Sequence, residues 1–443
     1  MDKMCVIPWI HLNIEPDKKV LPCCMTSQHR HTTLPPNPVV GNVSKESLED
    51  IWNNNKMKSL RKQFMKGEEP SICNRCFDDE RGGVISTRQY NNHTFPKMLK
   101  KIPEITLEDG TCTEFKLRYW DFRFSNLCNM KCRSCGPIYS SLWKEDARKL
   151  GNMDFLGPLG LNKKYIEKFD KDWDIFEKFK KTSHLMAKDN KDKVVKIDLV
   201  DNKKTFDFID EHIDYVEKIY FAGGEPLLMD EHWYIIEKLH RMKKFDVKIF
   251  YNTNMSTLKS KNKHIIDYWK DFHDIVIAAS IDEIDKRAEI VRSGTNWKRV
   301  EDNLIEVSKL KNIDLGLEIT VSAMNVFRLP EILQRFIDIG IIHGERSPPY
   351  QNFHLNHLFS PSVYHVSILT DSRRKQALKH LNNFFLDMMI KHKINLKPMF
   401  NQVIQELNKP QNTNARKRFF KLSERLDFIR KEKITDIIPE ILT

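Results

Sequence analysis

Three cysteines near the middle of the chain, Cys128, Cys132 and Cys135, follow one another at C-x3-C-x2-C spacing. A structural zinc site normally closes its shell with four ligands. A cubane iron–sulfur cluster also has four corners, usually held by four cysteines. Three local thiolates leave one corner open for a substrate or cofactor, unless a distant residue fills it. The spacing therefore predicts a reactive iron–sulfur cluster, with half of a zinc site completed elsewhere as the alternative.

A glycine-rich turn follows a β-rich run further along the chain. Residues 216–221 read VEKIYF, and Gly223, Gly224, Glu225 and Pro226 come one residue later. Glycines at the end of a strand let the backbone approach a ligand closely. This turn is therefore a candidate ligand-binding segment.

The cysteine spacing followed by Gly-Gly-Glu-Pro resembles the radical S-adenosylmethionine (SAM) enzymes. The resemblance implies that the three thiolates hold a [4Fe–4S] cluster, whose fourth iron binds the amino and carboxylate groups of SAM. One electron from the cluster then cleaves SAM to methionine and a 5′-deoxyadenosyl radical, which takes a hydrogen atom from the substrate. It also implies that the Gly223–Pro226 segment binds the SAM amino group.

Later strand ends carry weaker matches to the same family. Asn252 follows the predicted strand residues 247–251, and Ser280 and Asp282 follow an apolar run over residues 275–279. In related enzymes a polar residue at the second of these strand ends contacts the SAM ribose. Arg292 stands where the family often places a partner for the SAM carboxylate. The resemblance therefore adds these four residues to the predicted SAM site.

A second group of cysteines lies near the N-terminus: Cys5, the pair Cys23–Cys24, and the C-x2-C knuckle of Cys73 and Cys76. Cys5, Cys23, Cys73 and Cys76 supply four thiolates, which is enough for a closed site. An all-cysteine site suits an iron–sulfur cluster and zinc equally well. The lone Cys112 is expected to be a packing residue.

These cysteines resemble the SPASM and twitch modules, which bind auxiliary clusters in radical SAM enzymes that modify peptides and some other substrates. Between them, a helix is predicted to begin at Ser44 and to run to about Met65, with Gly67 as its stop signal. The resemblance implies a second [4Fe–4S] cluster of the single-cluster twitch type, with Cys23 as the ligand of the adjacent pair. Two features depart from the family: Lys18 replaces a frequent glycine, and the module comes before the radical SAM domain.

The overall composition bounds the class of protein. The chain has 443 residues, 40% of them hydrophobic, and nine cysteines in clustered spacings, which favour metal binding over disulfides. No apolar run reaches about 18 residues, and the N-terminus lacks a signal-peptide core, so no membrane helix and a cytoplasmic location are expected. The net charge of +12 is explained either by solvated lysines or by an acidic partner; nucleic acid is not excluded.

Apolar runs and helical periods alternate through the second half of the chain. Strands are predicted near residues 117–124, 216–221, 247–252, 275–281, 314–321 and 352–357, with helices between them, for example at 229–243, 296–311 and 330–339. Such alternation predicts an α/β fold with a parallel sheet, and the resemblance implies a partial (β/α)6 barrel. The expected domains are a cysteine module (1–92), a linker (93–116), the barrel (117–357, with an insertion at about 150–205) and a helical C-terminal region (358–443).

The sequence thus predicts a radical SAM enzyme with an N-terminal SPASM/twitch-like module. A peptide or protein side chain is the first-choice substrate, with the basic, aromatic insertion as a docking face or a solvated helix pair. A small-molecule or nucleotide-linked substrate is the alternative within the family. A zinc- or cluster-binding protein without turnover is the alternative outside it. An electron donor such as a flavodoxin or ferredoxin is the expected partner.

Overall fold

The computed structural model describes residues 3–26, 37–83, 85–137, 139–152, 202–343, 352–359, 361–393 and 395–442. The chain divides into two compact units, each assembled from separate stretches. The first unit contains Met1–Asn126, Val195–Phe250 and Asp271–Asp274, and the second contains Leu127–Val194, Tyr251–Lys270 and Ile275–Thr443. The predicted insertion at about 150–205 lies almost wholly outside the described residues.

The sheet of the first unit joins the N-terminal cysteine region to two strands of the predicted barrel. Its strands follow the order β6-β4-β1-β2-β3. β1 (His11–Ile14) pairs in parallel with β4 (Tyr119–Phe122), which pairs in parallel with β6 (Lys218–Phe221). β2 (Lys19–Leu21) and β3 (Gly41–Asn42) continue the sheet in antiparallel fashion. The cysteine region therefore contributes strands to the sheet that contains the first barrel strands.

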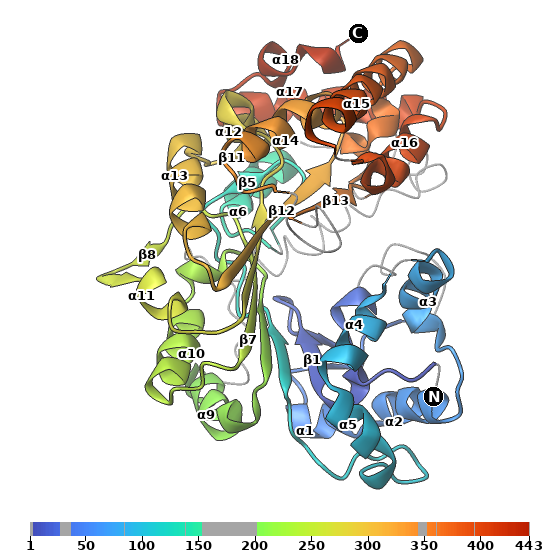
Figure 1. Ribbon diagram of the computed structural model, residues 1–443, viewed down its shortest axis with the longest axis vertical. Helices are drawn as coiled ribbons and strands as arrows, with labels where there is room; N and C mark the ends of the chain where they lie inside the picture. Colours follow the sequence, from blue (N-terminus) through green and yellow to red (C-terminus); the bar gives the residue numbers. More distant parts are fainter. Residues whose placement is uncertain are drawn as a thin grey trace. The chain divides into compact units, whose positions relative to one another are not determined.

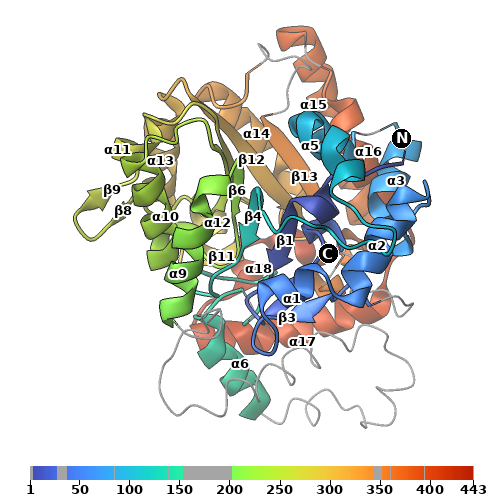
Figure 2. The same ribbon diagram turned by 90° about the horizontal axis from the view of Figure 1, so that it is seen from below.

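The helices of the first unit come from both of its long stretches. The N-terminal stretch forms α1 (Leu48–Trp52), α2 (Asn55–Met65), α3 (Asn74–Arg81), α4 (Thr87–Thr94) and α5 (Pro96–Lys101). The later stretch forms α9 (Asn202–His212) and α10 (Asp230–Arg241), which lie side by side in Figures 1 and 2. Phe206 of α9 and Tyr234 of α10 meet edge to face, with ring centroids 4.8 Å apart.

The prediction of one helix from Ser44 to about Met65 is wrong, because the segment forms two helices. Ser47, not Ser44, caps α1 by accepting a hydrogen bond from the Asp50 amide. The side chain of Asn54 then caps α2 by accepting from two backbone amides, so the chain restarts a helix where the sequence suggested continuity. The predicted end is confirmed: α2 stops at Met65, and Gly67 takes a positive φ of 73°.

The second unit contains three parallel strands in the order β13-β12-β10. These are β10 (Ile275–Ser280), β12 (Ile313–Val321) and β13 (Phe353–His357). The helices α12 (Asp285–Val291), α13 (Trp297–Ser308) and α14 (Leu329–Asp338) connect them. Buried residues alternate with half-buried ones along β10 and β12, as expected for strands with one apolar face against helices. β7 (Lys248–Thr253) runs from the first unit's residues into the second's.

The remaining elements of the second unit are short strand pairs and C-terminal helices. β5 (Lys131–Cys132) pairs with β11 (Arg292–Ser293), and β8 (Lys259–Ser260) pairs with β9 (Lys263–His264). The C-terminal region forms α15 (Asp371–His392), α16 (Asn401–Leu407), α17 (Thr413–Arg430) and α18 (Ile434–Ile437). α17 packs against α6 (Trp143–Asn152), as Figure 2 shows.

The predicted fold class is confirmed. All six predicted strands and the three predicted helices occur within a few residues of their expected positions, and strands alternate with helices along the chain. The pairings between these strands within each unit are parallel. The cysteine-rich N-terminal region and the helical C-terminal region are present as well.

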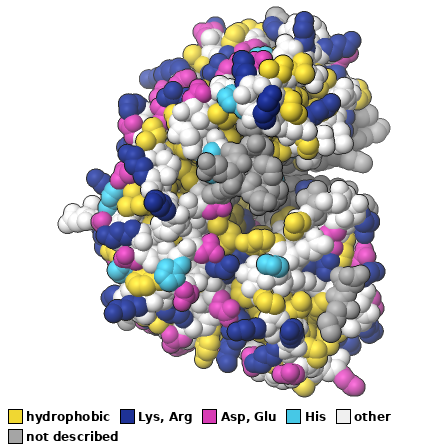
Figure 3. Space-filling model, viewed as in Figure 1, with side chains coloured by type: hydrophobic (Ala, Val, Ile, Leu, Met, Phe, Trp, Pro, Cys, Tyr) yellow, Lys and Arg dark blue, Asp and Glu magenta, His cyan; other side chains and the backbone are white. Residues whose placement is uncertain are grey.

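One face of the molecule carries charged side chains of both signs. On the face drawn in Figure 3, Lys and Arg side chains are scattered among Asp and Glu rather than gathered in one patch. Within the described stretches, no helix is both long enough and apolar enough to span a membrane.

Candidate metal centres

The three-cysteine loop lies in the second unit and is held by backbone hydrogen bonds. Cys132 belongs to β5 and lies opposite Arg292 of β11. The Arg133 amide donates to the Val291 carbonyl at 2.9 Å, and the Cys135 amide donates to the Cys132 carbonyl at 3.0 Å. The predicted cluster ligands therefore sit on a short turn that is pinned to the start of β11.

Two nitrogen donors from elsewhere in the second unit point at thiols of this loop. Nδ2 of Asn254 lies 3.9 Å from Sγ of Cys128, and Nη1 of Arg292 lies 3.8 Å from Sγ of Cys132. N–H groups directed at cysteine sulfur are one of the features by which a protein sets the potential of an iron–sulfur cluster. The donor set of three cysteines with two such N–H groups fits a cluster with one open corner.

Asp282 holds Arg292 in this position. Its Oδ2 accepts a hydrogen bond from Nε of Arg292 at 2.8 Å, and its Oδ1 accepts one from the Thr320 amide at 2.8 Å. Asp282 is buried, and its negative charge helps to raise the pKa of Arg292 although burial acts in the opposite direction. Both oxygens of Asp282 are thus engaged by the protein's own groups, while the Arg292 guanidinium reaches the cysteine loop.

The structure places the remaining predicted SAM residues at strand ends. Ser280 is the last residue of β10, and Asn252 is the next-to-last residue of β7; both are half-buried. Asn254, which the sequence did not assign to the site, contacts the cysteine loop instead through Cys128 and Asn129. The sequence held a signal for Asn254, because this residue ends the polar run Asn252–Asn254 that follows the strand residues 247–251.

The Gly-Gly-Glu-Pro turn lies in the first unit, directly after β6. Gly223 has a φ of 116°, and a β-carbon there would come within 3.1 Å of Cβ of Arg123. The Gly224 amide donates to the Ser125 carbonyl at 3.2 Å. Glu225 is buried and accepts a hydrogen bond from the Leu227 amide at 3.2 Å, which caps the short helix that begins at Pro226. The turn is therefore a rigid, closely packed strand end, as its glycines predict.

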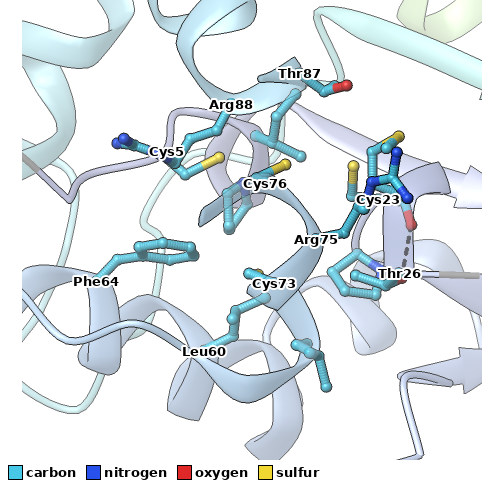
Figure 4. A pocket seen from close by; sticks show the side chains of 15 residues that line it. Cys5, Cys23, Thr26, Leu60, Phe64, Cys73, Arg75, Cys76, Thr87 and Arg88 are labelled. Carbon is cyan, nitrogen blue, oxygen red and sulfur yellow. Dashed lines mark hydrogen bonds between the residues drawn. The ribbon is translucent and has the colours of Figure 1, made fainter. Parts of the chain in front are cut away.

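The four N-terminal cysteines predicted to form a second site are brought together. Cys5 precedes a short 3-10 helix, Cys23 follows β2, and Cys73 and Cys76 lie at the start of α3. All four line one pocket, which is completed mainly by apolar side chains, as Figure 4 shows. The lining includes Ile7, Pro8, Pro22, Leu60, Phe64 and Ile72.

The adjacent cysteine and the lone cysteine behave differently from these four. Cys24 is not among the residues that line the pocket, although it is hydrogen-bonded to Cys23. Cys112 is buried in a separate place, where its thiol donates to the Glu114 carbonyl at 3.2 Å. Its environment is that of a packing residue.

Burial keeps the thiols of the N-terminal pocket protonated. It raises the pKa of Cys5 to about 12 and raises the pKa of Cys73 and Cys76 as well. The pKa of Cys23 is raised first by the hydrogen bond with Cys24 and then by burial. Thiols that stay neutral in an apolar pocket become thiolates when a metal binds and displaces their protons. Four cysteines of this kind around one pocket fit a buried metal centre.

In the described residues, no three His, Cys, Asp or Glu side chains converge on a single metal ion. In a cubane each thiolate binds its own iron, so the cysteines need only surround a shared space. In a zinc site all four sulfurs lie about 2.3 Å from one ion. The sulfurs of the N-terminal pocket can be seen around a common space in Figure 4.

Comparison with known families identifies the N-terminal module. Residues 5–77 match the SPASM family, described as an iron–sulfur cluster-binding domain. No curated protein matches the chain. Among solved structures, a similar chain is that of Streptococcus suis SuiB bound to precursor peptide SuiA, with 12% identity and a TM-score of 0.33. The alignment covers 87% of this chain and 72% of SuiB; at this low identity it gives no residue-by-residue correspondence.

Residues 5–77 are thus similar to the iron–sulfur cluster-binding domain of the SPASM family. This match supports the prediction, made from the sequence, of a SPASM-type module at the N-terminus. The matched residues include all four cysteines of the pocket. The match ends within α3, one residue after Cys76. The family match therefore favours an iron–sulfur cluster over structural zinc at the N-terminal site.

Proposed function

We propose that this enzyme reductively cleaves SAM and abstracts hydrogen from a peptide or protein side chain. The observation that carries the proposal is the three-cysteine loop, with Asn254 and Arg292 directed at two of its thiols. When bound there, a [4Fe–4S] cluster and SAM supply one-electron cleavage of SAM to methionine and a 5′-deoxyadenosyl radical. The chain's own residues hold these groups and orient them.

Each residue of the proposed site has a distinct task. Cys128, Cys132 and Cys135 bind three irons and leave the fourth for SAM. Arg292, oriented by Asp282, provides positive charge for the SAM carboxylate. On the sequence resemblance alone, the remaining SAM contacts are assigned to Gly223, Gly224, Glu225, Pro226, Asn252 and Ser280.

The N-terminal module is proposed to bind one auxiliary [4Fe–4S] cluster through Cys5, Cys23, Cys73 and Cys76. This single-cluster arrangement corresponds to the twitch version of the module. A peptide or protein substrate is supported by the family-level association of such modules with peptide modification, and this analogy leaves a small-molecule or nucleotide-linked substrate as the second candidate. A flavodoxin or ferredoxin as electron donor and a cytoplasmic location belong to the same proposal.

The test is SAM cleavage by the anaerobically reconstituted and reduced protein. We expect 5′-deoxyadenosine to be released, and Cys128→Ala, Cys132→Ala or Cys135→Ala to abolish its release. Cys112→Ala is the matched control, because this buried thiol lies outside both cysteine sets. If the cluster-loaded protein makes no 5′-deoxyadenosine with any reductant, the proposed activity is wrong.

A metal analysis separates the enzyme from a non-catalytic metal protein. Two cubanes correspond to about eight irons per chain, four for each cluster. The Cys128/Cys132/Cys135 triple alanine variant should keep about half of the iron. Zinc in place of iron in this variant would show that the N-terminal pocket is a structural zinc site.

A further inference from the structure

The three-cysteine loop is joined to the C-terminal end of the chain by a continuous row of ion pairs. Arg133 lies between two of the cluster cysteines in the sequence, yet its side chain is fully buried. Its Nη2 forms a hydrogen-bonded ion pair with Asp427 and another with Oε1 of Glu432, at 2.6 Å for the latter. Asp427 belongs to α17, and Glu432 lies two residues beyond the end of that helix.

The row continues from Glu432 through α17 to α6 and back to the loop. Nη1 of Arg430 lies 3.9 Å from Oε1 of Glu432, and its Nε lies 2.7 Å from Oδ2 of Asp146. The other oxygen of Asp146 lies 3.1 Å from Nζ of Lys131, which stands next to Cys132. The row therefore begins and ends on the residues that flank this cysteine.

The row consists of three cations alternating with three carboxylates, so its net charge is zero. Lys131, Arg133 and Arg430 are the cations, and Asp146, Asp427 and Glu432 are the carboxylates. The side chains of Arg133, Arg430 and Asp146 are at most 3% exposed. Removing one member of such a row leaves one uncompensated charge in a region where water screens poorly.

Trp143 links the row of ion pairs to the backbone of Cys132. The guanidinium of Arg430 lies over the ring of Trp143, 4.6 Å from its centroid. Nε1 of Trp143 donates a hydrogen bond to the Cys132 carbonyl at 2.9 Å. The Trp143 ring thus contacts both Arg430 and the backbone of the loop.

Stability alone does not explain the presence of this row of buried ion pairs. Buried ion pairs often contribute no more than well-packed apolar side chains of similar size. The Arg133 guanidinium is fully buried between its two carboxylates and also interacts with the Tyr364 side chain. Such a costly arrangement is expected where its charge and rigidity serve the neighbouring site.

We infer that the C-terminal segment from Asp427 to Glu432 positions the three-cysteine loop and sets the reduction potential of the cluster bound there. Arg133 is the positioning residue that receives both carboxylates. This inference rests on the proposed function, because it assigns the loop a cluster. It gives a role to a C-terminal region for which the sequence suggested no chemistry.

The charge balance predicts shifts of opposite sign in two variants. Arg133→Met leaves a net negative charge, which disfavours adding an electron, so the cluster's reduction potential should fall. Asp427→Asn leaves a net positive charge, so the potential should rise. Arg133→Lys keeps the charge and should stay close to the unchanged protein. A purely structural role would not produce opposite signs.

The potentials are measured by redox titration followed by electron paramagnetic resonance, in a Cys73→Ala/Cys76→Ala background that leaves only the three-cysteine loop to hold iron. Lys298→Met is the matched control, because it breaks an exposed ion pair with Asp302 on α13. Shifts of the same sign, or no shift, in the two test variants would overturn the inference. If Arg133→Met does not fold, the direction of the Asp427→Asn shift decides.

A readout without any cluster tests the positioning role and separates it from the proposed function. In the metal-free protein, Arg133→Met should speed backbone hydrogen exchange in residues 127–137, and Lys298→Met should not. Unchanged exchange there would show that the C-terminal segment does not hold the loop. Failure of SAM cleavage in the unchanged protein would instead contradict the proposed function, whatever the exchange rates are.

Discussion

Gly294 lies directly against the backbone of Asn129, inside the three-cysteine loop. A β-carbon on Gly294 would stand 2.7 Å from the Asn129 carbonyl oxygen, which is closer than a real side chain can approach. Gly294 also has a φ of 102°, which disfavours any other residue. The turn after β11 is therefore shaped so that the loop can lie on it.

We expect Gly294→Ala to displace the three-cysteine loop and to lower its iron content after reconstitution. Gly340→Ala is a matched control: Gly340 has a similar positive φ of 77°, but no heavy atom lies within 4 Å of the added carbon. Both variants carry backbone strain of roughly 1 kcal/mol, and only the first carries the clash. Equal iron contents in the two variants would contradict a close fit between Gly294 and the loop.

Cys23 and Cys24 should differ in their importance for the auxiliary cluster. Cys23 lines the pocket with Cys5, Cys73 and Cys76, whereas Cys24 is not among the lining residues. Cys23→Ser should therefore lose the auxiliary cluster, and Cys24→Ser should retain it. Iron analysis and visible absorption of both variants, in the triple alanine background at positions 128, 132 and 135, give the answer. Loss of iron only in Cys24→Ser would reverse the assignment.

Lys18→Gly should stabilise the N-terminal module. Lys18 stands in the turn between β1 and β2 with a φ of 67°, where its amide donates to the Glu15 carbonyl at 2.8 Å. A side chain in this conformation costs roughly 1 kcal/mol, and glycine avoids that cost. Urea unfolding should show a gain of up to about that size, reduced by the greater freedom of glycine in the unfolded chain.

Lys19→Gly is the control for this prediction, since Lys19 is in β2 and glycine weakens a strand. This substitution should lower the urea midpoint. If both substitutions lower it, the positive φ of Lys18 carries no strain that glycine can relieve.

His232 should make the protein sensitive to acid. The side chain is fully buried in α10, and burial lowers its pKa from 6.5 to about 3. The unfolded chain therefore binds a proton below pH 6.5 that the native protein rejects, so stability falls as the pH drops from about 6.5 toward 3. The slope is up to about 1.4 kcal/mol per pH unit for this one group.

Urea midpoints between pH 7.5 and 4.5 test the role of His232. His232→Leu should give a shallower loss of stability over this range than the unchanged protein. His273→Gln, at a side chain that is 66% exposed, should leave the slope as it was. An unchanged slope in His232→Leu would mean that other groups determine the acid response.

The fold could be predicted from the sequence because its signals are local. The strand of residues 275–280 and the helix of residues 297–308 are short, strongly patterned segments, and both occur where expected. The helix predicted from Ser44 failed for a local reason as well: the Asn54 side chain caps the start of α2 and so competes with helix continuation. Alternation of strands and helices then indicated the fold class.

For the candidate sites, the sequence predicted the metal-binding cysteines but not the residues that support them. The four cysteines of the N-terminal pocket follow from spacing and resemblance, and the structure gathers them. The groups that support the ligands come from distant segments, so no spacing reveals them. The ion pair of Arg133 with Asp427, for example, spans 294 positions. The sequence shows that Arg133 lies inside the cysteine loop, but it does not show that Asp427 and Glu432 are its partners.

The parallel pairing of β1 with β4 has a consequence for how the protein can be dissected. Because β1 covers one side of β4, a chain that begins after the cysteine module would expose the backbone of β4 as an unprotected sheet edge. Tyr119, Trp120 and Phe122 of that strand are all buried in the intact protein. Such an edge recruits other chains, so the shortened protein should aggregate instead of surviving as a separate domain.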